Sequence, residues 1–198
     1  MSPMVQIGLL IVGTLGSLYL TVIVLRFLFQ LAKADFYNPI SQIIVKATNP
    51  VLIPIRRVIP GFYGIDISSI VFAILFHWLV IQILAFILGA SIINPITAIT
   101  WAVVGLISLI VNIYFYGMII MIIASWIAPG SYNPILLLIR QIVAPITAPF
   151  RKIIPPMGGL DITPIFVFLA LQVCRIMIQA IAQKVGLTAQ VAPIVLGI

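Results

Sequence analysis

The sequence predicts an all-α membrane protein with four transmembrane helices in two parallel tandem repeats, each with an interfacial, amphipathic, proline-rich connector. Composition is the first indication, because 64% of the 198 residues are hydrophobic, only 7% are charged, and the mean hydropathy is +1.35. Soluble domains contain about 45–50% apolar and about 25% charged residues. A duplication is the second, since residues 37–70 recur at 132–165 without a gap and 14 of the 34 aligned positions are identical. A constant offset that preserves rare residue types indicates a repeated structural unit.

The four predicted spans are apolar runs at about 7–31, 67–90, 101–127 and 162–183. Each run is long enough to cross a hydrocarbon core of about 30 Å at about 1.5 Å per residue. They divide the chain into a first repeat, 1–92, and a second repeat, 93–198. The first run is longer than the apolar core of a secretory signal and no basic residue precedes it, so we expect a retained helix.

Three features mark the ends of these spans. Arg26 lies near the end of the first span, from where its long side chain can reach the headgroups as an anchor. Residues 91–100 predict a short uncharged turn between the second and third spans. Trp101 and Trp126 lie near the two ends of the third span, and indole side chains prefer these interfacial positions.

The positive charges predict the orientation. Seven Lys and Arg residues lie in the two connectors, 32–65 and 128–160, whereas the N-terminus and the central turn carry none. Cytoplasmic loops are enriched in Lys and Arg, so we expect both connectors in the cytoplasm and both termini on the other side. The two repeats would then enter the membrane in the same direction. Anionic lipid headgroups are the expected partners of the connectors, and nucleic acid is not, because the chain lacks a broad polar surface.

Each connector begins with a helix-start signal. Asn38-Pro39 and Asn133-Pro134 place an N-cap residue before a proline at the first helical position. Short helices are therefore predicted at 40–46 and 135–141. The prolines that follow are expected to break each segment into pieces; they are Pro50, Pro54, Pro145 and Pro149.

The connectors are too apolar for ordinary polar loops. We expect a bent amphipathic element in the headgroup region, with its apolar side against lipid or the helix bundle and its cations toward phosphates. The cations at the ends of the two connectors are Arg56, Arg57, Arg151 and Lys152. A shallow re-entrant loop is the alternative, and it would need shielding by protein.

Two carboxylates follow the connectors directly. Asp66 and Asp161 stand immediately before the second and fourth spans, where a carboxylate can cap the helix N-terminus. The same aspartates can form ion pairs with Arg56 and Arg151 and so fasten each connector to the following helix. Both roles can hold together, and neither implies catalysis.

The ends of both connectors resemble the repeat of the YggT family of bacterial inner-membrane proteins, also called the YlmG family. The matching stretches are Pro-Ile-Arg-Arg-Val-Ile-Pro at 54–60 with Gly-Ile-Asp at 64–66, and Pro-Phe-Arg-Lys-Ile-Ile-Pro-Pro at 149–156 with Gly-Leu-Asp at 159–161. The resemblance covers nearly the whole chain. It implies an inner-membrane location and a role in envelope physiology, such as tolerance of osmotic shock, potassium uptake, division or nucleoid distribution, or cytochrome assembly. It implies no catalytic residue and no cofactor.

Polar side chains also occur inside the predicted spans. The repeat offset aligns His77 in the second span with Gln172 in the fourth, and Arg175 lies well inside the fourth span. One hypothesis is a polar file for an ion or proton along the bundle axis, and the other is hydrogen bonding between helices. The absence of a carboxylate within the spans weakens the transport hypothesis.

Small or polar pairs occupy matching positions in the first and third spans. Gly13 and Ser17 correspond to Ser108 and Asn112 under the repeat offset. Pairs of this kind let helix backbones approach closely. We therefore expect the first and third spans to contact each other, or to face a sister subunit.

The sequence lacks the residue sets of enzyme and metal sites. It has no Ser-His-Asp set, no paired carboxylates at useful spacing, no phosphate-binding glycine loop and no metal cluster, and Cys174 is its only cysteine. We expect a non-enzymatic multi-pass membrane protein for envelope or osmotic-stress homeostasis. A small potassium channel or transporter, and an assembly or scaffold subunit of a larger membrane complex, are the alternatives, and a homo-oligomer is compatible with each.

Overall fold

The structure, a computed structural model, describes the whole chain except residues 1, 63, 129, 154–161 and 189–190. Every regular element in these described residues is helical. The elements, in chain order, are α1 (Pro3–Leu31), α2 (Pro39–Val58), α3 (Ile67–Ile87), α4 (Pro95–Ile127), α5 (Pro134–Ile153), α6 (Thr163–Lys184) and a short 3-10 helix, η1 (Ala192–Ile194).

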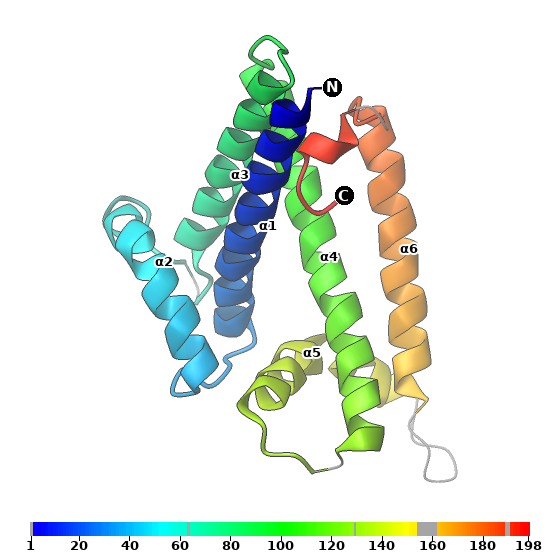
Figure 1. Cartoon of the computed structure of the whole chain (residues 1–198). Coiled ribbons are helices and arrows are strands. Elements are labelled where there is room, and N and C mark those ends of the chain that lie inside the picture. Colours follow the sequence, from blue (N-terminus) through cyan, green and yellow to red (C-terminus); the bar gives the residue numbers. More distant parts are fainter. Residues whose placement is uncertain (1, 63, 129, 154–161, 189–190) are drawn as a thin grey trace.

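The two halves of the chain have the same layout (Figure 1). α1 and α4 run in one direction, and α3 and α6 return beside them (Figure 1). Contact between α3 and α4 joins the halves, while α2 packs against α1 and α3, and α5 lies across the end of α4 and also contacts α6. The N-terminus, the α3–α4 turn and the C-terminal segment gather at one end, and the segments that lead into α2 and α5 lie at the other (Figure 1).

The number of helices able to cross a membrane exceeds the prediction. Among the described residues, five helices are long and apolar enough, namely α1, α3, α4, α5 and α6. The sequence predicted four spans and assigned the residues of α5 to the second connector, so the count of four is not confirmed. α5 is the least apolar of the five, with a mean hydropathy of 1.2 against 2.1–2.6 for the others.

Among the four predicted spans, the helix boundaries differ most from the prediction at α4. This helix begins at Pro95 and not near residue 101, so residues 95–100 of the predicted turn are helical. The side-chain oxygen of Asn94 accepts the backbone N–H of Ile96 at 2.9 Å, and proline follows at the first helical position. The Asn-Pro signal that predicts the starts of both connectors therefore also starts α4.

The prediction that the connectors break at their prolines is wrong. α2 continues through Pro50 and Pro54, and α5 continues through Pro145 and Pro149. A proline inside a helix removes one hydrogen bond and crowds the turn before it. The four-residue spacing places both prolines of each helix on one exposed face, so the lost bonds lie on the outward side. The opposite face packs against neighbouring helices and keeps the segment helical.

Two apolar clusters hold the helices together. The larger one joins α1, α3 and α4 and includes Leu20, Ile23 and Ile81, all with 0% exposure. Val195 and Leu196 of the C-terminal segment belong to the same cluster. The smaller cluster joins α4, α5 and α6 around Met118, Val143, Val167 and Leu171. The C-terminal segment is thus part of the core, a role that the sequence analysis did not anticipate.

Candidate functional site

In the first repeat, an ion pair joins the connector to the next helix. The guanidinium of Arg56, in the last turn of α2, pairs through Nη2 with Oδ2 of Asp66, and its Nε lies 3.4 Å from Oδ1. Asp66 also caps α3, where its carboxylate accepts the backbone N–H of Ser69 at 3.4 Å and the hydroxyl of the same residue. Both roles predicted for this aspartate therefore occur together.

The electrostatics of this cluster favour an ionised carboxylate. Burial alone would raise the pKa of Asp66, but the hydrogen bonds from Arg56 and Ser69 outweigh it and hold the pKa below its ordinary value. The Asp66 side chain is 2% exposed and that of Arg56 is 37% exposed. The charge of the aspartate is thus compensated inside the protein, and the arginine keeps access to the surroundings.

The corresponding cluster of the second repeat is only partly described. Arg151 and Lys152 lie exposed in the last turn of α5, as Arg57 does in α2. Asp161, the predicted cap and ion-pair partner, lies outside the described residues.

The two connectors also contact each other at their starts. The side-chain oxygen of Asn38 accepts the N–H of Ile40 at 3.0 Å, and its amide nitrogen donates to the carbonyl of Pro134 at 2.9 Å. The Gln141 side chain accepts the backbone N–H of Asp35 at 3.0 Å. Asn133 caps α5 in the same way, because its side-chain oxygen accepts the N–H of Ile135 at 2.9 Å. Asn133 is exposed, however, whereas Asn38 is buried, with 6% of its surface exposed. Asn38 therefore starts one connector and fastens it to the other, which sequence reasoning did not find.

Arg26 does not reach for the headgroups as predicted. It is 4% exposed, and its Nη1 donates to the carbonyl of Val45 at 3.2 Å and to the hydroxyl of Thr48. Both acceptors belong to α2, which packs beside this end of α1. A charged side chain inside a bundle needs such partners, because the alternative is an unpaired charge in an apolar environment. Arg26 thus links α1 to its connector.

The polar residues inside the predicted spans do not line up as a file. His77 is fully buried, and its Nδ1 lies 3.0 Å from the carbonyl of Ala102 while its Nε2 accepts the N–H of Leu196 at 2.9 Å. These partners require a neutral ring with the proton on Nδ1. Gln172, its counterpart in the repeat, lies exposed on α6. Arg175 is half-buried with its guanidinium 4.7 Å from the ring centre of Phe115. The histidine therefore has the inter-element bonding role that was one of the two hypotheses.

The C-terminal segment enters a groove next to His77. A methyl group added at Gly105 would lie 2.5 Å from the histidine Cε1 and 2.6 Å from the carbonyl oxygen of Leu196, so only glycine fits there. The carbonyl of Gly197 accepts hydrogen bonds from Ser108 and from Asn112, the latter at 3.1 Å. Irregular backbone at membrane depth needs such shielding and bonding by protein.

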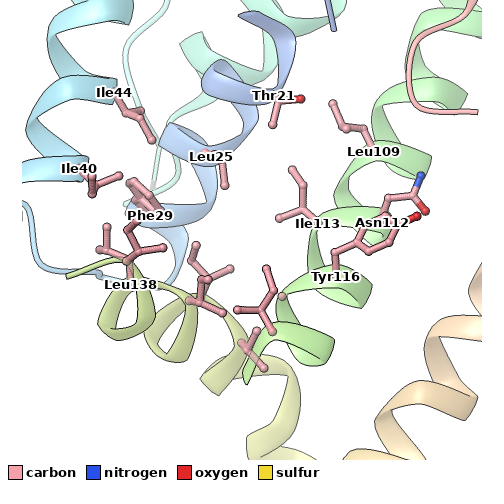
Figure 2. Close-up of a pocket in the computed structure, with 16 residues that line it drawn as sticks. Thr21, Leu25, Phe29, Ile40, Ile44, Leu109, Asn112, Ile113, Tyr116 and Leu138 are labelled. Atoms are coloured by element: carbon pink, nitrogen blue, oxygen red, sulfur yellow. The ribbon is translucent and has the colours of Figure 1, made fainter. Parts of the chain in front are cut away.

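These contacts correct the expected partner of the Ser108 and Asn112 face. The two side chains bond to the C-terminal segment, and a methyl group at Gly13 of α1 would meet none of the described atoms within 4 Å. Closer to the connectors, a cavity of about 510 Å³ separates α1 from α4 (Figure 2). Its walls are almost wholly apolar, and Leu25 of α1 and Ile113 of α4 project into it (Figure 2).

A second cavity, of about 760 Å³, lies between α4, α5 and α6. It differs from the first because charged and hydroxyl groups share its lining with apolar side chains. The polar contributors and the one indole are Ser125, Trp126, Arg140, Thr147 and Arg151. In the described part of the chain, no group of three or more His, Cys, Asp or Glu side chains is placed to hold a metal ion.

Comparison with known proteins places this architecture in a family. The CCB3/YggT family model matches residues 5–89 and 100–182, in two segments, as expected for a tandem repeat. An uncharacterized protein of Pseudomonas aeruginosa is 45% identical over 92% of this chain and 93% of its own length. The uncharacterized protein YggT of Escherichia coli K12 is 35% identical, over 89% of this chain and 91% of its own. No solved structure matches the chain.

Proposed function

This chain belongs to the CCB3/YggT family, and we propose that it is a non-enzymatic multi-pass protein of the bacterial inner membrane that supports envelope and osmotic-stress homeostasis. It would act through contacts of its paired connectors with anionic lipid and with other membrane proteins. The family resemblance is what motivates the inner-membrane location and the osmotic role. The arrangement of the connectors supports the mode of action.

We further propose that only α1, α3, α4 and α6 span the membrane, and that α2 and α5 are amphipathic helices at the cytoplasmic interface. The buried residues of α2 recur along one face, at Ser41, Ile44, Thr48 and Leu52, as expected for a helix that covers the bundle. Both connector helices carry two basic residues in their last turn, and α5 lies across the C-terminal part of α4 (Figure 1). A helix that carries cations and lies across the bundle suits the interface better than the bilayer core.

The single observation that carries the functional proposal is the attachment of the connectors to each other and to the spanning helices. Arg56 and Asp66 hold the end of α2 to the start of α3, and Asn38 bonds across to Pro134 at 2.9 Å. The exposed side of this assembly still offers Lys46 and Arg57 to anionic headgroups. In this proposal the attached connectors couple the membrane surface to the helix bundle, and no reacting group takes part.

The orientation is tested with an impermeant thiol reagent in intact cells. The exposed Cys174 is first replaced by alanine, and single cysteines are placed at Ser2 and at Lys152. We expect labelling at position 2 and none at position 152. Labelling of position 152 alone would reverse the orientation, and equal labelling of both would contradict the proposed topology.

The role is tested by osmotic downshift of a bacterial strain that lacks the gene. We expect poor survival, rescue by the wild-type chain, and weaker rescue by Arg56→Gln at equal expression. Lys184→Gln, which removes an exposed cation at the end of α6 and outside both connectors, is the matched control. Equal survival of the deletion and parent strains would overturn the proposal.

Two further experiments distinguish the alternatives. Potassium flux into liposomes that contain the purified protein, abolished by Arg175→Ala, would favour a channel or transporter. The hydrogen bonds of His77 instead support a structural role for this side chain. Gln82 has a similar role, because its amide closes the α3–α4 turn: the amide nitrogen donates to the carbonyl of Ile93 at 2.8 Å, and the amide oxygen accepts the N–H of Ile93 at 3.1 Å. Consistent recovery of other membrane proteins after mild-detergent purification would favour a scaffold subunit.

A further inference from the structure

The two repeats differ where the first spanning helix of each repeat meets its connector. Under the 95-residue offset, Arg26 of α1 corresponds to Met121 of α4, and Thr48 of α2 corresponds to Val143 of α5. In the first repeat the buried Arg26 guanidinium bonds to Thr48 and to the carbonyl of Val45, and it closes the space between helix and connector. The second repeat has neither partner of this contact.

An open cavity lies at the corresponding place in the second repeat. It has a volume of about 760 Å³, and Met121 is one of its lining residues. The residue that replaces Val45 is Arg140, which adds a cation to this cavity from the connector itself. The equivalent place thus holds a buried arginine side chain in the first repeat and an open cavity in the second.

The lining of the cavity matches a lipid headgroup and the start of its chains. Arg140 and Arg151 contribute positive charge, and in the described part of the chain no side chain forms an ion pair with Arg140. Ser125 and Thr147 contribute hydroxyl groups, while Met121, Ile122 and Ile165 provide apolar walls. A planar guanidinium can bind two oxygens of one phosphate group at once. Trp126, at the rim, is 81% exposed, as expected of an indole at the membrane interface.

We propose that this cavity, lined by α4, α5 and α6, is a binding site for the phosphate-bearing headgroup of an anionic phospholipid, and that the first repeat has no such site. The proposal rests on the interfacial placement of α5 described under the proposed function. A free phosphate ion shares the headgroup chemistry. The apolar walls favour the lipid, because an inorganic ion gains nothing from them.

Trp126 provides a direct reporter of occupancy. In a Trp78→Phe, Trp101→Phe background it is the sole tryptophan, and a brominated lipid quenches its fluorescence on contact. The full-length protein is reconstituted in zwitterionic bilayers with a small, fixed share of brominated phosphatidylglycerol or brominated phosphatidylcholine. We expect the anionic lipid to bind beside Trp126 about fivefold better than the zwitterionic one.

Variants then assign this preference to the cavity. Arg140→Gln should bring the ratio of the two lipids close to one, whereas Arg140→Lys should keep most of it. Arg57→Gln, which removes an exposed cation of the first connector outside the cavity, should leave the ratio unchanged. An unchanged ratio in Arg140→Gln, or an equal loss in Arg57→Gln, would overturn the proposal.

The remaining outcomes distinguish a lipid headgroup from a free phosphate ion, and the headgroup site from the interfacial placement of α5. Relief of quenching by added inorganic phosphate would assign the site to a soluble phosphate and overturn the lipid assignment. Equal quenching by both lipids, in the single-tryptophan protein with Arg140 and Arg57 unchanged, would overturn the headgroup site and leave the interfacial placement of α5 intact. No quenching by either lipid would place Trp126 outside the bilayer, and both proposals would then fail.

Discussion

His77 accepts a hydrogen bond from the backbone N–H of Leu196, a residue 119 positions later in the chain, at 2.9 Å. This bond ties the C-terminal segment to the middle of α3, while the other ring nitrogen faces the carbonyl of Ala102 in α4. One side chain thus joins three parts of the fold that the hydropathy pattern treats as separate.

Replacing His77 tests how much this joint contributes. In His77→Leu, the buried N–H of Leu196 loses its partner, and an unpaired buried polar group costs about 1–3 kcal/mol. We expect a loss of stability of that size in detergent unfolding and faster thiol labelling of a cysteine placed at position 196. Gln172→Leu is the matched control, because the equivalent residue of the second repeat is exposed. Equal effects of the two substitutions would contradict this role of the histidine.

Gly105 is predicted to be intolerant of even the smallest side chain. A methyl group there would lie 2.6 Å from the carbonyl oxygen of Leu196 and 2.8 Å from a methyl carbon of Val195, so the C-terminal segment must move. Overpacking of this kind costs about 1–3 kcal/mol. We expect Gly105→Ala to lower the unfolding midpoint in detergent and to expose the C-terminal segment to carboxypeptidase.

Gly13→Ala is the control for this substitution. A methyl group at position 13 meets none of the described atoms within 4 Å, and alanine favours the helix over glycine by about 1 kcal/mol. Gly13→Ala should therefore be neutral or slightly stabilising. If Gly13→Ala lost stability and Gly105→Ala did not, the groove next to Gly105 would have room for a methyl group, contrary to this prediction.

Asp66 should give the stability a specific dependence on pH. Its folded-state pKa is lowered, so its contribution is present above the unfolded-state value of about 3.9 and is lost as the pH falls through the folded-state pKa. Asp66→Asn removes the ion pair with Arg56 and weakens the cap of α3, which we expect to cost about 1–2 kcal/mol at neutral pH.

The measurement is unfolding in detergent at a series of pH values. The difference between wild type and Asp66→Asn should be constant near neutral pH and should shrink below about pH 4. Asp35→Asn serves as the control, because this aspartate is exposed and, among the described residues, its carboxylate bonds only to the N–H of Tyr37, at 2.8 Å. If the stability difference between wild type and Asp66→Asn grew as the pH fell, the pKa of Asp66 would be raised on folding and not lowered.

The sequence predicts most of the helical layout because local signals determine it. Long apolar runs predict the spans, and Asn before proline predicts the starts of α2 and α5, as Asn38 and Asn133 show. It fails where the outcome depends on a neighbouring element. Pro50 stays helical because the opposite face of α2 is packed, and Arg26 stays buried because α2 supplies its acceptors.

The C-terminal segment shows the same limit more strongly. Nothing in its residues, considered alone, predicts burial in the bundle, because the groove exists only once α3 and α4 have packed with Gly105 at their contact. In the candidate sites, the Arg56–Asp66 pair follows from spacing within one repeat. The cavity beside Arg140 follows from a difference between the repeats that becomes visible only in space.

Asn38 and Asn133 offer a comparison within one molecule, because both cap a connector helix. Among the described residues, only Asn38 also donates to the other connector, at Pro134. Aspartate keeps the capping oxygen and removes the donor. Asn38→Asp should cost about 1–2 kcal/mol, since a buried carboxylate would face a carbonyl oxygen, whereas Asn133→Asp should be neutral or slightly stabilising at the helix N-terminus. Detergent unfolding of the two variants, with disulfide cross-linking between cysteines placed at the starts of α2 and α5, measures both effects. Equal stability and equal cross-linking would mean that the connectors are not fastened to each other through Asn38.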